Sequence, residues 1–236
     1  MKNILTIAGR QFRSYFNGPV AYIVICIVML TLGFFFWKTF FLFGRASARE
    51  MFRWLSLILV FALPALTMGL LAEEKRTGTI ELLITMPVTE AQVVVGKFLG
   101  VFGLYAVLLV LTLPYPISIA TLGDLDWGPV WGGYFGLVLQ GSAVLAIGLM
   151  ASSWTNNQLI ALFVALTLSV FFWVIDKFLP LLPTSAASTL QWLSFDYHFQ
   201  SMARGVIDLR DILFFFSMTL LALAAAFRAL ESRRWS

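Results

Sequence analysis

Hydrophobic residues gather in six long runs separated by shorter polar segments, and this pattern dominates the chain. A run of about 20 apolar residues can cross the hydrocarbon core of a bilayer as a helix. The pattern therefore predicts an all-α polytopic membrane protein with six transmembrane helices in a single domain over residues 1–236. Because this number of spans is even, both termini are expected on the same side of the membrane. The expected spans are about 20–37, 54–72, 93–113, 130–152, 159–182 and 212–230.

The most polar segment in the first half of the chain separates the second and third expected spans. Its four consecutive charges, at 73–76, cannot sit in hydrocarbon because desolvating each would cost several kcal/mol, so they are expected to end the second span. Gly78 permits a turn, and Thr79 can cap a short helix that Pro87 would stop. Residues 89–92 would then begin the helix that re-enters the membrane. The pattern predicts a short, partly apolar helix outside the membrane, shaped to contact another protein.

The first residues of the chain place apolar and basic positions at helical spacing. Over residues 2–17 the apolar side chains share one side, and polar and basic residues occupy much of the other. This pattern predicts an amphipathic elbow helix in the headgroup region. Arg10 and Arg13 would face anionic lipid, and Phe12 and Phe16 would lie on the apolar side.

The longest segment outside the expected spans lies between the fifth and sixth, at about 183–211. It is too polar to cross the membrane and too apolar for a free loop, so it is expected to form one or two short helices. Trp and Tyr favour the membrane–water interface, which predicts a re-entrant hairpin at the outer surface. His198 there is expected to form hydrogen bonds rather than bind a ligand or carry protons. The candidate residues of this hairpin are Trp192, Phe195, Tyr197, His198, Phe199, Arg204 and Gly205.

The composition supports a membrane protein. The chain is 60% hydrophobic with 12% charged residues, which is about half the charge of a typical soluble domain. The net charge of +4 comes from basic residues spread through the loops, a distribution typical of topology signals and not of a nucleic-acid site. One cysteine and one histidine exclude an internal disulfide and argue against a metal site.

The distribution of Lys and Arg favours cytoplasmic termini only weakly. With the termini inside, the inner segments would hold nine of the 16 basic residues and the outer segments seven. The basic stretch at 38–53 would then lie outside, against the usual preference for positive charge in the cytoplasm.

Two groups of glycines have a four-residue spacing that permits close approach of another helix. They are Gly96 with Gly100, and Gly128 with Gly132 and Gly136. The spacing does not identify the partner helix.

The sequence carries little sign of its own energy source. Residues 96–98, Gly-Lys-Phe, resemble the end of a phosphate-binding loop, but the required first glycine and the Ser or Thr after the lysine are missing. No nucleophile–base pair is visible, so the chain is not expected to be an enzyme. No charge stands at the centre of an expected span, and Asp176 with Lys177 falls near an interface, which argues against an ion-driven carrier.

Two segments together resemble the signature of ABC-2-type (type V) exporter permeases. The first, at 73–89, is Glu-Glu-Lys-Arg-Thr-Gly-Thr-Ile-Glu-Leu-Leu-Ile-Thr-Met-Pro-Val-Thr, and the second, at 95–98, is Val-Gly-Lys-Phe. They are particularly similar to permeases of the gliding-motility and nitrous-oxide-reductase maturation branch. The stretch 195–211, with Arg204-Gly205 and Asp208, is similar to that branch as well. The resemblance covers nearly the whole chain.

The resemblance implies a homodimeric membrane subunit that works with two copies of a separately made ABC ATPase. That partner would bind ATP and Mg, and no cofactor is expected in this chain. The loop after the second span would be the coupling helix, at about 77–86, seated in a groove of the ATPase. The expected contact residues are Glu73, Glu74, Lys75, Arg76, Thr77, Gly78, Thr79, Ile80, Glu81, Leu82, Leu83 and Met86.

The resemblance also implies an arrangement in the membrane. The elbow would pack against the coupling loop, spans one and five would meet across the dimer axis, and the outer hairpin would close the pathway. The expected location is the bacterial inner membrane with both termini cytoplasmic.

Three functions stay open at this level. The first is an export permease driven by the partner ATPase. The second is a membrane scaffold that transmits the conformational changes of the ATPase to an auxiliary membrane-anchored periplasmic protein without moving a solute. Whether spans one, two and five present polar residues to a central cavity would distinguish the exporter from the scaffold. The third is an ATP-independent channel or carrier, against which a neighbouring gene for a P-loop ATPase would count. The apolar and aromatic spans mildly favour lipid-like or amphipathic cargo over ions.

Overall fold

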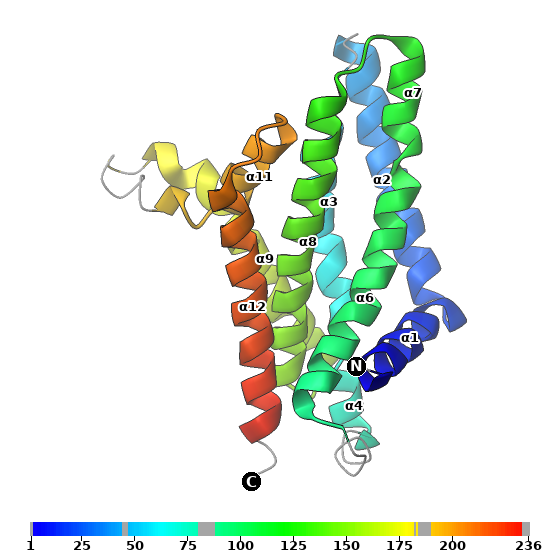
Figure 1. Ribbon diagram of the computed structural model, residues 1–236, viewed down its shortest axis with the longest axis vertical. Helices are drawn as coiled ribbons and strands as arrows, with labels where there is room; N and C mark the ends of the chain where they lie inside the picture. Colours follow the sequence, from blue (N-terminus) through cyan, green and yellow to red (C-terminus); the bar gives the residue numbers. More distant parts are fainter. Residues whose placement is uncertain (1, 44–46, 80–87, 182, 184–189, 233–236) are drawn as a thin grey trace.

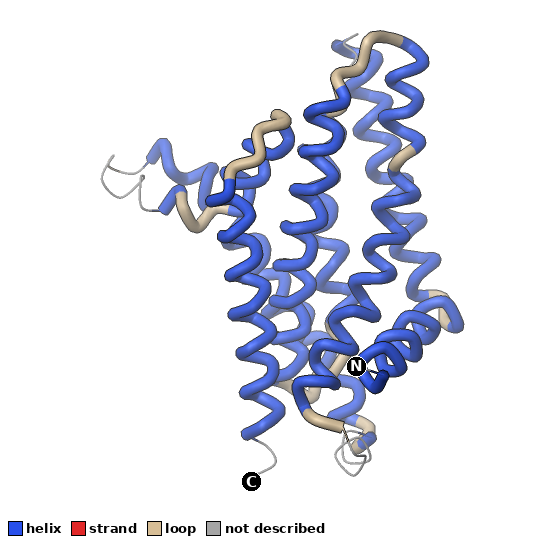
Figure 2. Tube along the Cα trace, in the orientation of Figure 1, coloured by secondary structure: helices blue, strands red, loops and turns tan. Residues whose placement is uncertain are grey.

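The computed structural model describes residues 2–43, 47–79, 88–181, 183 and 190–232. These residues form helices joined by short turns, with no strand among them (Figure 2). Within these residues, six helical segments are long and apolar enough to cross a membrane. The prediction of an all-α protein with six spans is therefore confirmed.

The spans stand side by side in one bundle (Figure 1). Several extend beyond the expected boundaries, because charged and aromatic residues can form helix turns outside the hydrocarbon core. Two spans are interrupted, one between α3 and α4 and the other at Leu113, between α6 and α7. The helices that build the spans are α2 (Val20–Phe43), α3 (Arg49–Thr67), α4 (Ala72–Arg76), α6 (Glu90–Thr112), α7 (Pro114–Leu122), α8 (Trp127–Trp154), α9 (Gln158–Phe178) and α12 (Leu209–Glu231).

The helix of the second span ends earlier than the sequence pattern predicts. The charges at 73–76 are expected to end it, but α3 already ends at Thr67 and the charges form the separate short helix α4. The hydroxyl of Thr67 donates to the carbonyl oxygens of Leu63 (3.2 Å) and Pro64 (3.0 Å). The Met68 N–H still donates to the Pro64 carbonyl oxygen at 3.0 Å, but the next bond runs from the Leu70 N–H to the Thr67 carbonyl oxygen at 3.1 Å. This i→i+3 bond tightens the backbone into a turn and ends the α-helix.

The N-terminal helix α1 (Lys2–Asn17) crosses the start of α6 (Figure 1). It fits there because α6 presents glycines to it: a Cβ on Gly100 would lie 2.6 Å from Gln11 Cβ, and one on Gly96 would lie 2.8 Å from Ile7 Cβ. Tyr15, near the end of α1, is buried and donates from its hydroxyl to the Leu66 carbonyl oxygen at 2.6 Å. Burial raises the pKa of Tyr15, which keeps the phenol a neutral donor.

Helix α8 is the most buried of the six spans and packs against α3, α9, α11 and α12. Small residues on α8 receive large side chains from its neighbours, so Phe52 of α3 lies against Gly133 and Tyr105 of α6 lies against Gly141. The Tyr105 hydroxyl also donates to the Leu137 carbonyl oxygen at 2.6 Å. Helix α8 is thus a central helix of the bundle, in contact with α3, α6, α9 and α12, whereas α2 packs on α3.

One short helix, α11 (Phe195–Ala203), forms in the described part of the expected outer hairpin. It packs on the glycine face of α8, where a Cβ on Gly132 would lie 2.4 Å from the Met202 carbonyl oxygen. The helix is followed by Gly205 with φ +86°, a backbone conformation that favours glycine. A 3₁₀ turn, η1 (Leu179–Leu181), follows α9, and residues 184–189 of the expected hairpin lie outside the described residues.

Helices α1 and α4 and the end of α12 lie at one end of the bundle, the lower end of Figure 1, and α7 and α11 lie toward the opposite end. This is the arrangement that an even number of crossings requires.

Candidate functional site

The turn that connects α3 to α4 is held by one hydroxyl from α8. Ser152 Oγ accepts hydrogen bonds from the backbone N–H groups of Leu71 and Ala72, both at 3.0 Å, and donates to the Met68 carbonyl oxygen at 2.9 Å. The first N–H groups of a helix have no partner within that helix, and α4 has no side-chain cap of its own at Leu71. Ser152 therefore fixes the start of α4 against the end of α8.

A buried lysine of α6 holds α4 from a second direction. Lys97 lies within the first turns of α6 and is 3% exposed. Its Nζ donates to the Leu70 carbonyl oxygen at 2.6 Å and pairs with Glu74 Oε1 at 2.7 Å. A buried ammonium is tolerated only when paired and hydrogen bonded, so this lysine ties α6 to both the turn and α4.

Lys75 of α4 turns inward rather than toward solvent. It is 8% exposed, and its Nζ donates to the Ser153 carbonyl oxygen near the end of α8. Glu73 and Arg76, by contrast, form an ion pair of 2.6 Å on the outer side of α4, where Arg76 is largely exposed. An exposed pair of this kind contributes little stability. Helix α4 thus has an anchored face and a free face.

We call the five residues that make these contacts the α4 anchor. Sequence reasoning placed Glu74 and Lys75 at the ATPase contact and assigned no role to the other three members. A lysine one turn inside an expected span was the available signal, because such a charge requires an acidic partner. The members are Glu74, Lys75, Lys97, Ser152 and Ser153.

The free end of α4 leads into the expected coupling helix. Thr77 Oγ1 donates to the Glu73 carbonyl oxygen at 2.9 Å, and Gly78 follows with φ +72°, so the expected turn at this glycine is present. Thr79 Oγ1 lies 3.0 Å from Thr77 Oγ1. The remaining expected contact residues lie outside the described residues: Ile80, Glu81, Leu82, Leu83 and Met86.

The chain returns through a capped helix start next to α1. Thr89 Oγ1 accepts from the Gln92 backbone N–H, and Gln92 Oε1 accepts from the Thr89 backbone N–H, a reciprocal capping box. Asn3 of α1 donates to the same Gln92 oxygen at 3.4 Å. On α1, Phe12 and Phe16 are half-buried with ring centroids 5.0 Å apart, and Arg10 and Arg13 are exposed.

The opposite end of the bundle contains a second polar group of residues, around α11. His198 is 1% exposed. Its Nε2 donates to the Trp192 carbonyl oxygen at 3.0 Å, because a carbonyl can only accept, and its Nδ1 lies 2.6 Å from Asp211 Oδ1. The imidazole also stacks on Phe214 of α12, with centroids 4.1 Å apart. His198 therefore links α11 to the first turn of α12.

Lys177, in the last turn of α9, also belongs to the polar group of residues around α11. Its Nζ pairs with Asp196 of α11 and, at 3.3 Å, with the neighbouring Asp176. Asp196 is buried and also accepts from Gln200 Nε2 at 2.7 Å. Within the described residues, no three His, Cys, Asp or Glu side chains are grouped so as to hold a metal ion.

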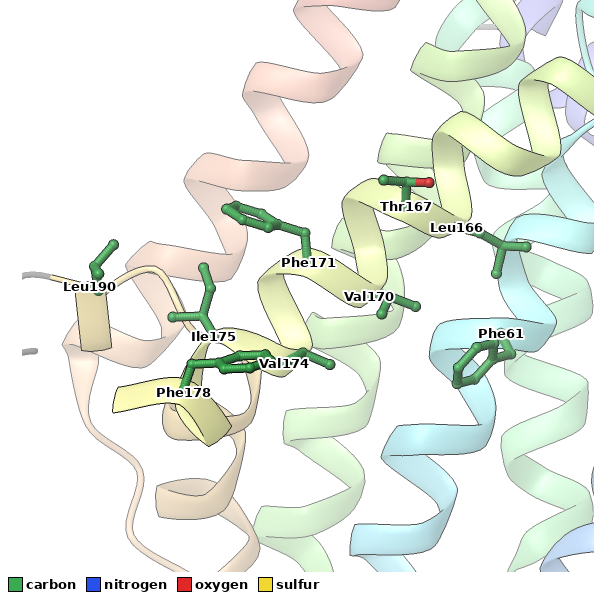
Figure 3. A pocket seen from close by; sticks show the side chains of 9 residues that line it. All are labelled: Phe61, Leu166, Thr167, Val170, Phe171, Val174, Ile175, Phe178 and Leu190. Carbon is green, nitrogen blue, oxygen red and sulfur yellow. The ribbon is translucent and has the colours of Figure 1, made fainter. Parts of the chain in front are cut away.

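An open groove of about 580 Å³ runs along α9 beside Phe61 of α3. Figure 3 shows the apolar side chains of α9 that line it; Thr167 is the one polar side chain among the described lining residues. We call it the α3–α9 groove. Large apolar side chains are likewise exposed along α2, for example Leu30 and Phe34. These surfaces suit contact with lipid, with apolar cargo or with another helix.

Comparison with known proteins gives the family. The chain matches the family model described as ABC-2 family transporter protein over residues 29–232, most of its length. A search of curated proteins gave no match. The six apolar helices agree with a multi-pass membrane component of an ABC system. The chain therefore belongs to the ABC-2 family of transporter proteins.

Proposed function

We propose that this chain is the permease subunit of an ABC exporter, driven by a separate ATPase that docks on α4 and on residues 77–86. The subunit works as a homodimer with two ATPase copies, which bind ATP and Mg. It lies in the bacterial inner membrane with both termini and α4 in the cytoplasm. Family membership supports the permease role, and the position of α1, α4 and the end of α12 at the same end of the bundle is compatible with this orientation.

The observation that carries the proposal is the α4 anchor. At the end of the second span, α4 is held to α6 by Lys97 and to α8 by Lys75 and Ser152. Each contact is buried or made by the backbone, so a displacement of α4 cannot be absorbed by loose side chains. Movement imposed on residues 77–86 would therefore be passed to two spans at once.

The mechanism that follows is a two-state lever. ATP-driven closure of the ATPase dimer moves the coupling segment, and the α4 anchor transmits this movement to α6 and to the central helix α8. The conformational energy comes from contacts that differ between the two states of the ATPase. This chain contributes the stiff connection, and the partner contributes the chemistry.

The proposal is tested by purifying the tagged chain in detergent, identifying the proteins that co-purify and measuring ATP hydrolysis. We expect a P-loop ATPase at one-to-one stoichiometry, lost when residues 77–86 are scrambled. Glu81→Leu should reduce stimulation of ATP hydrolysis while the bundle stays folded. Glu231→Leu is the matched control at the same end, outside α4, and should leave stimulation unchanged. A chain that purifies alone and without ATP hydrolysis would refute the ATPase-driven role and favour an independent channel or carrier.

A membrane scaffold that acts on an auxiliary periplasmic protein is the second candidate. The observation that favours it is the apolar lining of the α3–α9 groove, which offers no row of polar groups along its described residues for a hydrophilic solute. Reconstitution of the complex in vesicles distinguishes the two. An exporter moves a labelled amphiphile in proportion to ATP hydrolysed, whereas a scaffold hydrolyses ATP without any such movement.

A further inference from the structure

A pocket of about 350 Å³ lies between the first turns of α3 and helix α11, at the end of the bundle opposite α4. Phe199 and Ala203 of α11 are buried in its wall. Three arginines from two distant parts of the chain line it, Arg49 and Arg53 from α3 and Arg204 directly after α11. Guanidinium groups gathered around one concave site point to an anionic ligand.

The carboxylates in the pocket do not cancel this charge. Asp196 is already neutralised, because it is buried against Lys177 and accepts from Gln200. Glu50 reaches Arg53 only at 3.9 Å, with both side chains well exposed, so this ion pair is weak. An incoming anion therefore competes with one loosely held carboxylate for three guanidinium groups.

The arginines are also placed where an anion would stabilise the fold. Arg49 is the first residue of α3, and a positive charge is unfavourable at the positive end of a helix dipole. The preceding residue, Ala48, provides no side-chain cap; Ser47 Oγ accepts from the Arg49 N–H at 3.4 Å, and Glu50 is the one acid in the first turn. Arg204 uses Nε for its hydrogen bond to the Gln200 carbonyl oxygen at 3.2 Å, so its terminal amino groups extend beyond that contact. A bound anion would offset the charge at the start of α3.

The surface next to the pocket is apolar. The exposed stripe of α3 begins with Glu50 and Arg53 at the pocket and continues, at helical spacing, through half-buried Leu57 to exposed Phe61. Phe61 lines the α3–α9 groove. One continuous face therefore changes from charged at the bundle end to apolar toward the middle. That order of charge and apolar surface matches a lipid lying with its head at the membrane surface.

We propose that the pocket binds the phosphate group of an anionic lipid, whose acyl chains lie along the α3–α9 groove. Arginine suits phosphate because its planar fork donates two parallel hydrogen bonds to the oxygens. The site also gives a role to the basic stretch at 38–53, which runs against the usual charge distribution if the termini are cytoplasmic. The lipid belongs to the outer leaflet in that orientation, and only this assignment of leaflet rests on the proposed function.

The test uses the full chain in neutral detergent and phosphatidylglycerol labelled on one acyl chain, with binding followed by fluorescence anisotropy. Phosphatidylcholine with the same label is the comparison, because it has the same phosphate but cancels the charge with its choline group. We expect saturable binding of phosphatidylglycerol at least about tenfold tighter than that of phosphatidylcholine, because the arginines would repel the choline cation. Equal affinity for the two lipids would overturn the proposal.

Single substitutions locate the site. Arg53→Gln and Arg204→Gln should each weaken phosphatidylglycerol binding about fivefold, the range for an exposed charge-assisted bond. Arg210→Gln, at the same end but over the Trp192 ring, is the matched control and should change nothing. Glu50→Gln removes the competing carboxylate and should tighten binding about twofold, a gain that a damaged fold would not produce.

Two results would count against the site. An equal loss from Arg210→Gln and Arg53→Gln would indicate attraction to the general surface charge and overturn the pocket. Inorganic phosphate should displace the labelled lipid little more than chloride does at the same ionic strength, because phosphate lacks the acyl chains. Displacement by phosphate at lipid-like concentrations would identify a free-phosphate site and overturn the lipid assignment. None of these measurements involves an ATPase, so they stand or fall separately from the permease role.

Discussion

The buried ammonium of Lys97 provides the strictest test of how α4 is held. Lys97→Met keeps most of the length and the apolar stem of the side chain but removes the charge and its three donors. The Leu70 carbonyl oxygen, 2.6 Å from Nζ, and Glu74 Oε1, at 2.7 Å, would both lose this donor. The perturbation therefore acts on the connection between α6 and α4 and on little else.

Opposing contributions set the size of the change in the free energy of unfolding that Lys97→Met causes. A hydrogen bond to a charged group contributes about 1.5–3 kcal/mol, and breaking a buried ion pair costs about 3–5 kcal/mol. The Glu74 side chain is 27% exposed, so water replaces part of the lost interaction, and methionine removes the cost of burying an ammonium. We expect the free energy of unfolding to fall by about 2 kcal/mol.

Equilibrium unfolding in mixed micelles, followed by tryptophan fluorescence, measures this change. Lys2→Met, at an exposed lysine of α1, is the matched control and should shift the free energy by less than about 0.5 kcal/mol. Glu74→Gln completes a double-mutant cycle, in which Lys97 and Glu74 should show a coupling of about 1 kcal/mol or more. A Lys97→Met protein as stable as the parent, or strict additivity of the two changes, would refute the role assigned to this pair.

Further predictions concern packing and the two polar clusters. Gly100→Ala should destabilise the protein by about 1–3 kcal/mol because its Cβ would meet α1. Gly9→Ala, with open space around it, should be neutral or stabilising by up to about 1 kcal/mol. Thermal unfolding in detergent compares the two variants. Ser152→Ala should cost about 1–3 kcal/mol and speed hydrogen exchange in the turn before α4. Asp211→Ala should lower the thermal midpoint because the buried His198 Nδ1 loses its hydrogen-bond partner, and a midpoint equal to that of the parent would contradict this role.

The spans were predictable because lipid imposes a simple requirement, about 20 apolar residues per crossing, on each segment separately. The α4 anchor was not predictable in the same way. Treating 73–76 as one block of charge assigned all four residues to water, yet Lys75 is buried because α8 brings the Ser153 carbonyl oxygen to it. Such a contact joins residues 78 positions apart, and no local pattern specifies that distance.

The glycines illustrate the same limit. Their spacing predicted that something would pack closely on the third and fourth spans, because a missing Cβ allows a backbone to approach. The identity of the partner came only from the fold: Gly100 receives α1, and Gly132 receives α11. The pocket lined by the arginines could not be predicted from the sequence either, since Arg53 and Arg204 are brought together by the packing of α3 and α11 on α8.

The seat of α1 on α6 also has a consequence for how the protein is made. Residues 2–17 leave the ribosome before their docking surface at 96–103, which is synthesised about 80 residues later. At about 5–20 residues per second, that delay lasts on the order of 4–20 s. During this time an amphipathic helix can rest on the membrane surface. A nascent chain arrested before residue 103 should therefore leave α1 open to protease, and one arrested well beyond it should protect α1.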